Sequence, residues 1–373
     1  MGNYGVPPIM LVNGRGSTVT DSCGREYIDL IAGIAVNALG HGDERMVRAV
    51  HEQMASLGHV SNLYATEPGI RLAERLIDLV GDPSARVFFC NSGAEANEAA
   101  FKISRLTGRT RVIVAEGSFH GRTMGALGLT AQPGKADPFR PLPGEVAVVP
   151  FGDVSALERA MNEDTAALFL EPIQGEAGVV DPPAGYLIAA REITERCGSL
   201  LIVDEVQTGI GRTGQWFAYQ TSGVQPDVIT LAKGLAGGLP MGAVIGVGAA
   251  GELFGPGSHG STFGGNPISA AAALTVLDAI EQDNLLERAV VAGDRLVTGI
   301  KEIMGDDATG SRGRGLLRAV ALKDESAREL EVKLRENGVL VNAVTSSAVR
   351  LAPALTISDE EITRALDGWA AAQ

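Results

Sequence analysis

Short apolar stretches rich in β-branched residues recur through the middle of the chain, separated by segments with helical periodicity. Such uninterrupted runs are typical of strands buried on both faces of a mainly parallel sheet. Helices are expected between several of them, for example over Ala94–Arg105 and Val154–Met161. The pattern therefore predicts an α/β fold with helices on both faces of a sheet. Seven strands are expected, at Arg86–Cys90, Arg111–Ala115, Val146–Phe151, Ala167–Glu171, Leu200–Asp204, Val228–Leu231 and Ala243–Val247.

The regular alternation of strands and helices ends after Gly265, and a different pattern follows. It predicts a smaller α+β domain over residues 267–373, after a large domain over residues 46–266. Residues 1–45 do not fit the alternation either, and we expect them to pack with the smaller domain. The elements expected in the smaller domain are helices over Pro267–Gln282, Leu285–Ile303 and Ser326–Asn337, strands over Leu316–Leu322, Val339–Val344 and Ala348–Leu351, and a last helix from Ser358.

Charge and composition narrow the classes of function. The 373 residues carry a formal net charge of −14, whereas a nucleic-acid-binding protein usually shows a basic face. No apolar run approaches the length of a membrane-spanning helix, so we expect no membrane partner. Cys23, Cys90 and Cys197 are odd in number and lack metal-ligand spacing, which favours a reducing, cytoplasmic location with no disulfides and no bound metal. A protein that acts on small molecules is the class that remains.

Two charged residues follow apolar strands. Asp204 ends the strand LLIVD, and ligands of open α/β sheets bind beyond the carboxyl ends of strands. Lys233 follows another strand among Gly and Ala, and a desolvated lysine has a lowered pKa and becomes a nucleophile for Schiff-base chemistry. Each residue also has an ordinary interpretation: a helix cap or solvated loop acid for Asp204, and a solvated strand end for Lys233. Either feature alone leaves both interpretations open.

A third feature completes a set. In CNSGAEAN, a strand ends at Cys90 and a turn opens a helix near Ala94, and free N–H groups at a helix N-terminus bind phosphate. Ser92 is suited to cap this helix and to bond an anion. A lysine for a Schiff base, an aspartate for a pyridinium nitrogen and a phosphate site together match pyridoxal phosphate. The residues thus predict this cofactor.

A different cofactor is suggested by Gly209, Gly211 and Gly214, which form a G-x-G-x-x-G run with Asp227 further on. A nicotinamide-dependent dehydrogenase would place such glycines directly after a strand and at the opening of a crossover helix. Here the glycines do not directly follow the strand, and TGQWFAYQ is a poor opening for a helix. A dehydrogenase therefore remains only a remote alternative.

Several segments resemble the fold-type I, class III aminotransferases, which are pyridoxal-phosphate enzymes, and the resemblance covers nearly the whole chain. The class-wide segments are EPIQGEAG (Glu171–Gly178), DEVQTGIGRTG (Asp204–Gly214), LAKGLAGGLPMGA (Leu231–Ala243) and HGSTFGGNP (His259–Pro267). Others resemble the acetylornithine aminotransferase subfamily, namely VNALGH (Val36–His41), SNLYATEP (Ser61–Pro68) and FHGRTMGAL (Phe119–Leu127). One departure is Gly42-Asp43-Glu44, where relatives usually carry a His-Pro pair.

The resemblance implies a fold-type I architecture and a set of cofactor-binding residues. Lys233 would hold the cofactor as a Schiff base and move protons, and Asp204 would keep the ring nitrogen protonated. Gln207 would bond the phenolic oxygen, and Phe119 would stack on the ring, although core packing is an equally good role for it. Thr262 would complete the phosphate site from the partner subunit of a homodimer. The phosphate itself would be cradled by Ser92, Gly93 and Ala94.

The resemblance also implies substrate-binding residues. Arg122 would bind a substrate carboxylate, and Arg350 the α-carboxylate of glutamate, since a guanidinium binds both carboxylate oxygens. Glu176 would pair with Arg350 when an ω-amino donor is bound and release it for glutamate. Ser261 and Tyr4 are further substrate-contact candidates. For each arginine, a solvated surface charge is the ordinary alternative.

The implied reaction is a ping-pong transamination in which N-acetylornithine gives its δ-amino group to 2-oxoglutarate. The products would be N-acetylglutamate 5-semialdehyde and glutamate, as in arginine biosynthesis. Another ω-aminotransferase of this class, acting on ornithine, 4-aminobutyrate or succinyl-diaminopimelate, remains an alternative. A catalytically inactive binding protein on the same fold is a third, which the presence of Lys233 and Asp204 disfavours.

Overall fold

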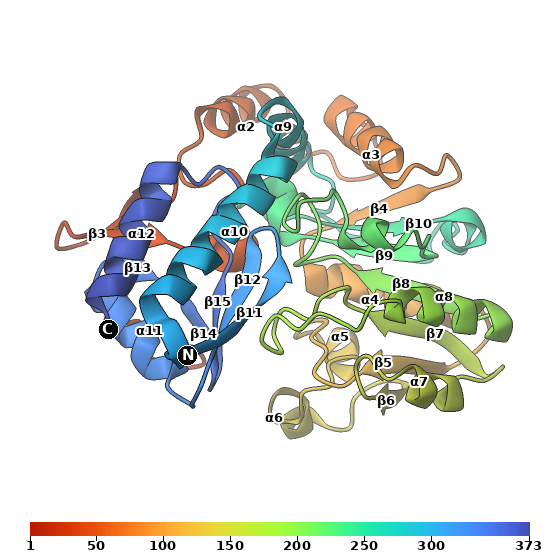
Figure 1. The fold of residues 1–373 in the computed structure, drawn as a ribbon. Helices are drawn as coiled ribbons and strands as arrows, with labels where there is room; N and C mark the ends of the chain where they lie inside the picture. The colour runs from red at the N-terminus through yellow and green to blue at the C-terminus, as the bar shows by residue number, and fades with distance from the viewer.

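A computed structural model describes residues 1–373, and its centre is a seven-stranded sheet (Figure 1). The strands lie in the order β4-β10-β9-β8-β7-β5-β6, and all neighbours are parallel except that β10 is antiparallel to both β4 and β9. The expected mainly parallel α/β sheet is thereby confirmed. Its strands are β4 (Arg86–Cys90), β5 (Arg111–Ala115), β6 (Glu145–Val149), β7 (Thr165–Leu170), β8 (Leu200–Asp204), β9 (Val228–Leu231) and β10 (Gly242–Gly246).

Helices bury both faces of this sheet. Along β5, Val112 and Val114 belong to one apolar cluster, while Ile113 and Ala115 belong to another, because successive side chains of a strand point to opposite faces. The first cluster is completed by α4 (Gly93–Arg105), and the second includes the apolar side chains of α8. Both faces of the sheet are therefore buried, which explains why its strands are continuously apolar in sequence. The other helices between residues 44 and 197 are α2 (Glu44–Ser56), α3 (Glu67–Val80), α5 (Met124–Gly128), α6 (Pro133–Ala136), α7 (Val154–Ala160) and α8 (Tyr186–Cys197).

Two four-stranded sheets form the remainder, on the other side of the molecule in Figure 1. One has the order β1-β2-β3-β13 and the other β11-β12-β15-β14. Their strands are β1 (Leu11–Arg15), β2 (Thr18–Asp21), β3 (Glu26–Asp29), β11 (Ala308–Arg314), β12 (Leu317–Leu322), β13 (Val339–Leu340), β14 (Asn342–Thr345) and β15 (Ala348–Leu351). The longer helices that follow the central sheet are α9 (Pro267–Gln282), α10 (Leu285–Met304), α11 (Ala327–Glu336) and α12 (Asp359–Ala371).

Short helical segments fill the connections. Several helix starts are set by caps that satisfy free N–H groups: Asp43 accepts from Arg45 and Met46 at α2, and Ser358 and Glu361 form a capping box at α12. Asp43 belongs to the segment where the sequence departs from the family pattern, so this departure keeps a good helix start. The short segments are α1 (Ala32–Ala35), η1 (Asp137–Phe139), η2 (Ala218–Ser222), η3 (Lys233–Ala236), η4 (Gly248–Glu252) and η5 (Gly305–Asp307).

Two expectations for the C-terminal part were wrong. The strand expected over Val339–Val344 is divided into β13, which pairs in parallel with β3, and β14, which pairs with β15. Strand β11 was not expected at all, because its sequence ATGSRGR is polar and glycine-rich; it pairs as an edge strand with β12. Through β13, the N-terminal strands and the C-terminal residues share one sheet.

The G-x-G-x-x-G run does not form a dinucleotide-binding turn. The residues between β8 and η2 form turns, Gly211 and Gly214 have positive φ angles, and no crossover helix begins there. A Cβ on Gly214 would meet Val290 of α10 at 2.4 Å, so this glycine allows the close approach of a helix. Separately, none of the helices is both long and apolar enough to cross a membrane.

Candidate active site

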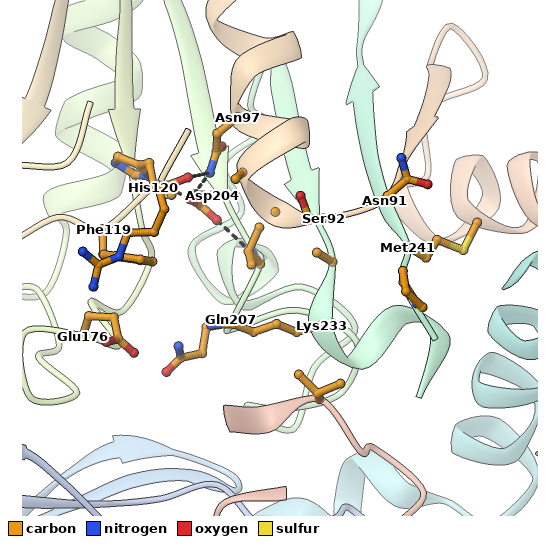
Figure 2. A pocket seen from close by; sticks show the side chains of 18 of the residues that line it. Asn91, Ser92, Asn97, Phe119, His120, Glu176, Asp204, Gln207, Lys233 and Met241 are labelled. Atoms are coloured by element: carbon orange, nitrogen blue, oxygen red, sulfur yellow. Dashed lines mark hydrogen bonds and ion pairs between the residues drawn. The ribbon is translucent and has the colours of Figure 1, made fainter. Parts of the chain in front are cut away.

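Five strands of the central sheet end at one edge, where the loops that follow them surround a cavity of about 370 Å³ (Figure 2). These strands, β4, β5, β7, β8 and β9, run in the same direction, because β4 and β9 are both antiparallel to β10. Their carboxyl ends therefore bring together residues from distant parts of the sequence. The expected site residues that line this cavity are Ser92, Gly93, Ala94, Phe119, Arg122, Glu176, Asp204, Gln207 and Lys233.

Asp204 lies at the end of β8, nearly fully buried, and its carboxylate is held by several donors. Asn97 Nδ2 donates to Oδ2 over 2.7 Å, and His120 Nδ1 lies at the same distance from that oxygen. The Val206 N–H donates to Oδ1 over 2.9 Å. The dashed lines in Figure 2 show the bonds from Asn97 and His120 meeting at Asp204. Asn97 is in turn fixed by Thr230, whose hydroxyl donates to its Oδ1, so Asp204 has one defined orientation.

His120 and Glu171 form the buried electrostatic surroundings of Asp204. Burial acts to lower the pKa of His120, but the hydrogen bond and charge of Asp204, together with Glu171, outweigh it and hold the pKa above its usual value. Burial raises the pKa of Glu171, although the charge of His120 opposes the rise. Glu171 accepts from the backbone N–H groups of Phe119 and Gly175. His120, Glu171 and Asp204 thus form a cluster of ionisable groups in the cavity wall.

Lys233 follows β9 and begins η3. Its φ angle of 44° lies in the left-handed region, which is unusual for a residue with a side chain. Burial lowers the pKa of its amine to about 8, while the charge of Glu176 opposes the change. The lysine is therefore close to half neutral near pH 8, unlike an ordinary surface lysine.

The N-terminus of α4 forms the part of the cavity that follows β4. Ser92 is the N-cap, and its Oγ accepts from the Glu95 N–H over 3.2 Å, as the sequence predicts. A Cβ on Gly93 would lie 2.7 Å from a methyl group of Val206, so glycine is required for this close approach. The free N–H groups and the dipole of this first turn suit an anion such as phosphate.

Arg350, on β15 in the C-terminal part of the chain, is almost fully buried and contacts two residues of the cavity wall, Glu176 and Gln207. It forms a short ion pair with Glu176. Its Nη1 also donates to Gln207 Oε1 over 3.0 Å, and its Nη2 donates to Asn342 Oδ1 over 2.8 Å. Burial acts to raise the pKa of Glu176, but Arg350 holds it below its usual value, with help from Lys233 and Lys135.

Phe119 and the cations beside it form another wall. Arg122 is exposed, and its guanidinium carbon lies 5.6 Å from the centroid of the Phe119 ring. Lys135 Nζ lies 4.7 Å from the same centroid. Phe119 itself is half-buried and lines the cavity, so it is not simply a core residue. A ring flanked by two cations gives the cavity a wall suited to a flat, anionic ligand.

Four expected residues do not line the cavity within this chain: Arg350, which only contacts its wall, and Tyr4, Thr262 and Ser261. Tyr4 is 94% exposed, near the N-terminus. Thr262 is exposed on the segment between η4 and α9. Ser261, next to it, accepts a hydrogen bond of 3.0 Å from Asn91, a residue of the cavity wall.

Sequence reasoning missed three buried polar residues that line this cavity, namely Asn97, His120 and Glu171. Each lies inside a segment that the sequence analysis had singled out: NSGAEAN, FHGRT and EPIQGEAG. A helical count would have placed Asn97 on α4 one turn after Gly93, on the side facing β9. No sequence signal pairs Asn97 with Asp204, since 107 residues separate them.

The chain belongs to the class III aminotransferase family, whose sequence profile, described as aminotransferase class-III, matches residues 2–372. It is therefore an aminotransferase, and pyridoxal phosphate is the cofactor of its family. The acetylornithine aminotransferase of Mycolicibacterium smegmatis is 58% identical over 97% of this chain and 93% of its own length.

Solved structures agree with this assignment. The N-acetylornithine aminotransferase of Stenotrophomonas maltophilia has a TM-score of 0.87 and 36% identity, covering 100% of this chain and 97% of its own. The ornithine aminotransferase of Toxoplasma gondii has a TM-score of 0.92 and 33% identity, covering 98% and 91%. That Toxoplasma structure has partial occupancy of pyridoxal phosphate at its active site. The fold-type I architecture expected from the sequence is thus confirmed.

Proposed function

We propose that this aminotransferase moves the δ-amino group of N-acetylornithine to 2-oxoglutarate, forming N-acetylglutamate 5-semialdehyde and glutamate. The observation that carries the proposal is that Lys233, Asp204 and Glu176 line one cavity, and that Glu176 is paired there with the buried Arg350. The substrate is inferred from relatives at 50–59% identity, all of which are named acetylornithine aminotransferase. The proposal includes a ping-pong order, since one site must serve both amino acids in turn.

The residues of the cavity fit pyridoxal phosphate. The first turn of α4, with Ser92, Gly93 and Ala94, offers N–H donors to a phosphate, and a Cβ at Gly93 would close the space. Asp204, held in one orientation, is placed to pair with a protonated ring nitrogen. When bound, the cofactor supplies a protonated ring that accepts the electron pair of the bond being broken.

Lys233 supplies the base and acid at the reacting carbon. The pKa of its amine is about 8, so the neutral amine can take a proton from the reacting carbon near neutral pH. It can then return that proton to the neighbouring atom. Asp204 would keep the ring nitrogen of the bound cofactor protonated, and Asn97 and His120 fix the orientation of its carboxylate. Phe119 is placed to stack on the ring face and to exclude water.

Carboxylate recognition is divided between two arginines. Arg122, which lines the cavity and is exposed, would hold the carboxylate far from the reacting amine. Arg350 would hold the α-carboxylate of glutamate, and for this it must first release Glu176. When N-acetylornithine reacts through its δ-amino group, no α-carboxylate lies beside the reacting carbon, and the pair stays closed. Gln207, which accepts from Arg350 here, would also bond the phenolic oxygen, while Ser261 and Tyr4 would contact substrate from the entrance.

We also propose a homodimer with shared active sites and a cytoplasmic location. Thr262 is exposed and does not line the cavity of its own chain, which suits a residue that completes the partner's phosphate site. Large apolar side chains are exposed beside it and on the segment before α3, namely Phe263, Leu63 and Tyr64. The three cysteines are all free, as is usual in a reducing compartment.

Half-reaction spectroscopy tests the proposed function. The purified, cofactor-loaded enzyme is mixed separately with N-acetylornithine, ornithine, 4-aminobutyrate and succinyl-diaminopimelate, and the change in visible absorption is followed. We expect the fastest conversion per unit concentration with N-acetylornithine and full reversal by 2-oxoglutarate. A preference of tenfold or more for ornithine, the substrate named for the Toxoplasma relative, would replace N-acetylornithine as the donor.

A further inference from the structure

Glu176 stands between two cavities. It lines the active-site cavity, and it also lines a neighbouring cavity of about 750 Å³ formed by the segments 116–117 and 130–136. Its Oε1 contacts Arg350. Its Oε2 lies 3.8 Å from Lys135 Nζ, and Lys135 lines only the neighbouring cavity. The two oxygens of one carboxylate thus contact two different cations.

An exchange of partners at Arg350 leaves a problem for Glu176. When a substrate α-carboxylate takes its place on Arg350, Glu176 loses its closer ion pair and keeps only the 3.8 Å contact with Lys135, while its side chain is only 22% exposed. A largely buried carboxylate with only a distant partner is costly. This free-energy cost is smaller if a rotamer change of Glu176 can bring its carboxylate to another cation. The rotamer change also requires free space for the moved side chain. Lys135 and the neighbouring cavity provide both.

We propose that Lys135 is the second partner of Glu176, to which this carboxylate turns when an α-amino acid occupies Arg350. The proposal rests on the exchange of partners described under the proposed function. Lys135 acts as a positioning residue: it draws Glu176 out of the active-site cavity and keeps it paired there. The ammonium is itself held over the Phe119 ring, 4.7 Å from its centroid, so its place does not depend on Glu176 alone.

The electrostatic surroundings of Lys135 agree with such a role. Burial lowers the pKa of its amine, Glu176 opposes this, and the nearby charges of Arg122 and Arg350 lower it further. The lysine therefore lies in a cationic region that favours a closer carboxylate. Another cation that lines the neighbouring cavity, Arg140, is paired with Asp137 and is largely exposed. It offers a matched control.

The test measures binding of glutarate, a dicarboxylate without an amino group, to the cofactor-free protein by calorimetry. We expect Lys135→Met to weaken glutarate binding about fivefold, close to one kcal/mol for a partly exposed ion pair. Lys135→Arg keeps the cation and should stay within about twofold of the wild type. Arg140→Met removes a cation from the same cavity and should leave binding unchanged.

In the loaded enzyme, Lys135→Met should slow the glutamate half-reaction, through a higher half-saturating concentration, and leave the N-acetylornithine half-reaction unchanged. Because Lys135 acts through Glu176, it should have little further effect in a Glu176→Gln background. Equal losses in both half-reactions, or unchanged glutarate binding, would overturn the assignment of Lys135. A different result is expected if Glu176 does not exchange with a substrate carboxylate on Arg350. In that case Glu176→Gln alone would alter both half-reactions equally, whatever residue occupies position 135.

Discussion

Lys233 combines two features that are uncommon in a lysine, a left-handed backbone and a lowered pKa. If it moves the proton in the reaction, Lys233→Ala should reduce turnover by about a thousandfold or more, the usual scale for loss of an acid–base group. Lys323→Ala, an exposed lysine after β12, is the control and should keep full activity. Steady-state rates measure the effect, and near-normal turnover in Lys233→Ala would refute the role. The wild type should also show visible absorption that borohydride bleaches.

The lowered pKa of Lys233 makes a prediction about pH. Burial disfavours the ammonium form, so the neutral amine should appear as pH rises through about 8 instead of through the ordinary lysine value of 10.5. We expect acylation of Lys233 in the cofactor-free protein to increase across that range, measured by mass spectrometry of its peptide. In Glu176→Gln the midpoint should fall further, because the carboxylate that stabilises the ammonium is gone. The unfolded protein is the control, and a native midpoint near 10 would contradict the prediction.

The site residues that could be predicted from the sequence are those that lie directly next to a strand end or a helix start. Asp204 and Lys233 follow apolar strands, and Ser92 precedes a helix, so strand ends and a cap predict them. The partners of Asp204 are different, because His120 lies 84 residues away and Asn97 lies 107 residues away. Their contact depends on how β5 and β8 are arranged around β7, which no local pattern contains.

At the scale of elements, the packing of β10 between β4 and β9 depends on Gly242. A Cβ there would lie 2.5 Å from the Ser92 carbonyl oxygen and 2.8 Å from the Cys90 sulfur. We expect Gly242→Ala to destabilise the fold by about 1–3 kcal/mol, the usual cost of overpacking, and to weaken pyridoxal phosphate binding by displacing the loop before α4. Gly310→Ala on β11, where a Cβ meets nothing within 4 Å, is the control. Thermal unfolding and cofactor titration measure both, and wild-type values for Gly242→Ala would contradict the argument.

Strands with a clear hydrophobic pattern were predicted well, whereas strands that depend on pairing with a distant strand were not. The central strands were found to within one or two residues, because both of their faces are buried and their sequences are continuously apolar. Strand β11 is polar and glycine-rich, and it exists because β12 supplies its hydrogen-bond partners. The break between β13 and β14 is likewise set by β3 on one side and β15 on the other. Long-range pairing therefore explains both errors.

At the scale of the whole molecule, the proposed homodimer gives each active site residues from two chains. Thr262 would serve the partner's phosphate site, while Lys233 and Asp204 serve their own. Two variants that are inactive alone, Lys233→Ala and Thr262→Glu, should then restore activity when co-expressed. In the mixed dimer one site carries both changes and the other carries neither. Random pairing of a two-fold symmetric dimer predicts recovery of about a quarter of wild-type activity.

The matched control for this experiment is co-expression of Lys233→Ala with Asp204→Ala. Both residues line the cavity of the same chain, so each site of that mixed dimer carries one of the two changes and none is intact. No activity should return. Recovery with Thr262→Glu but not with Asp204→Ala requires that Thr262 cross to the other subunit, since a site built within one chain would leave both pairs equally inactive. An active monomer in sedimentation, or no recovery in either pair, would exclude the shared site.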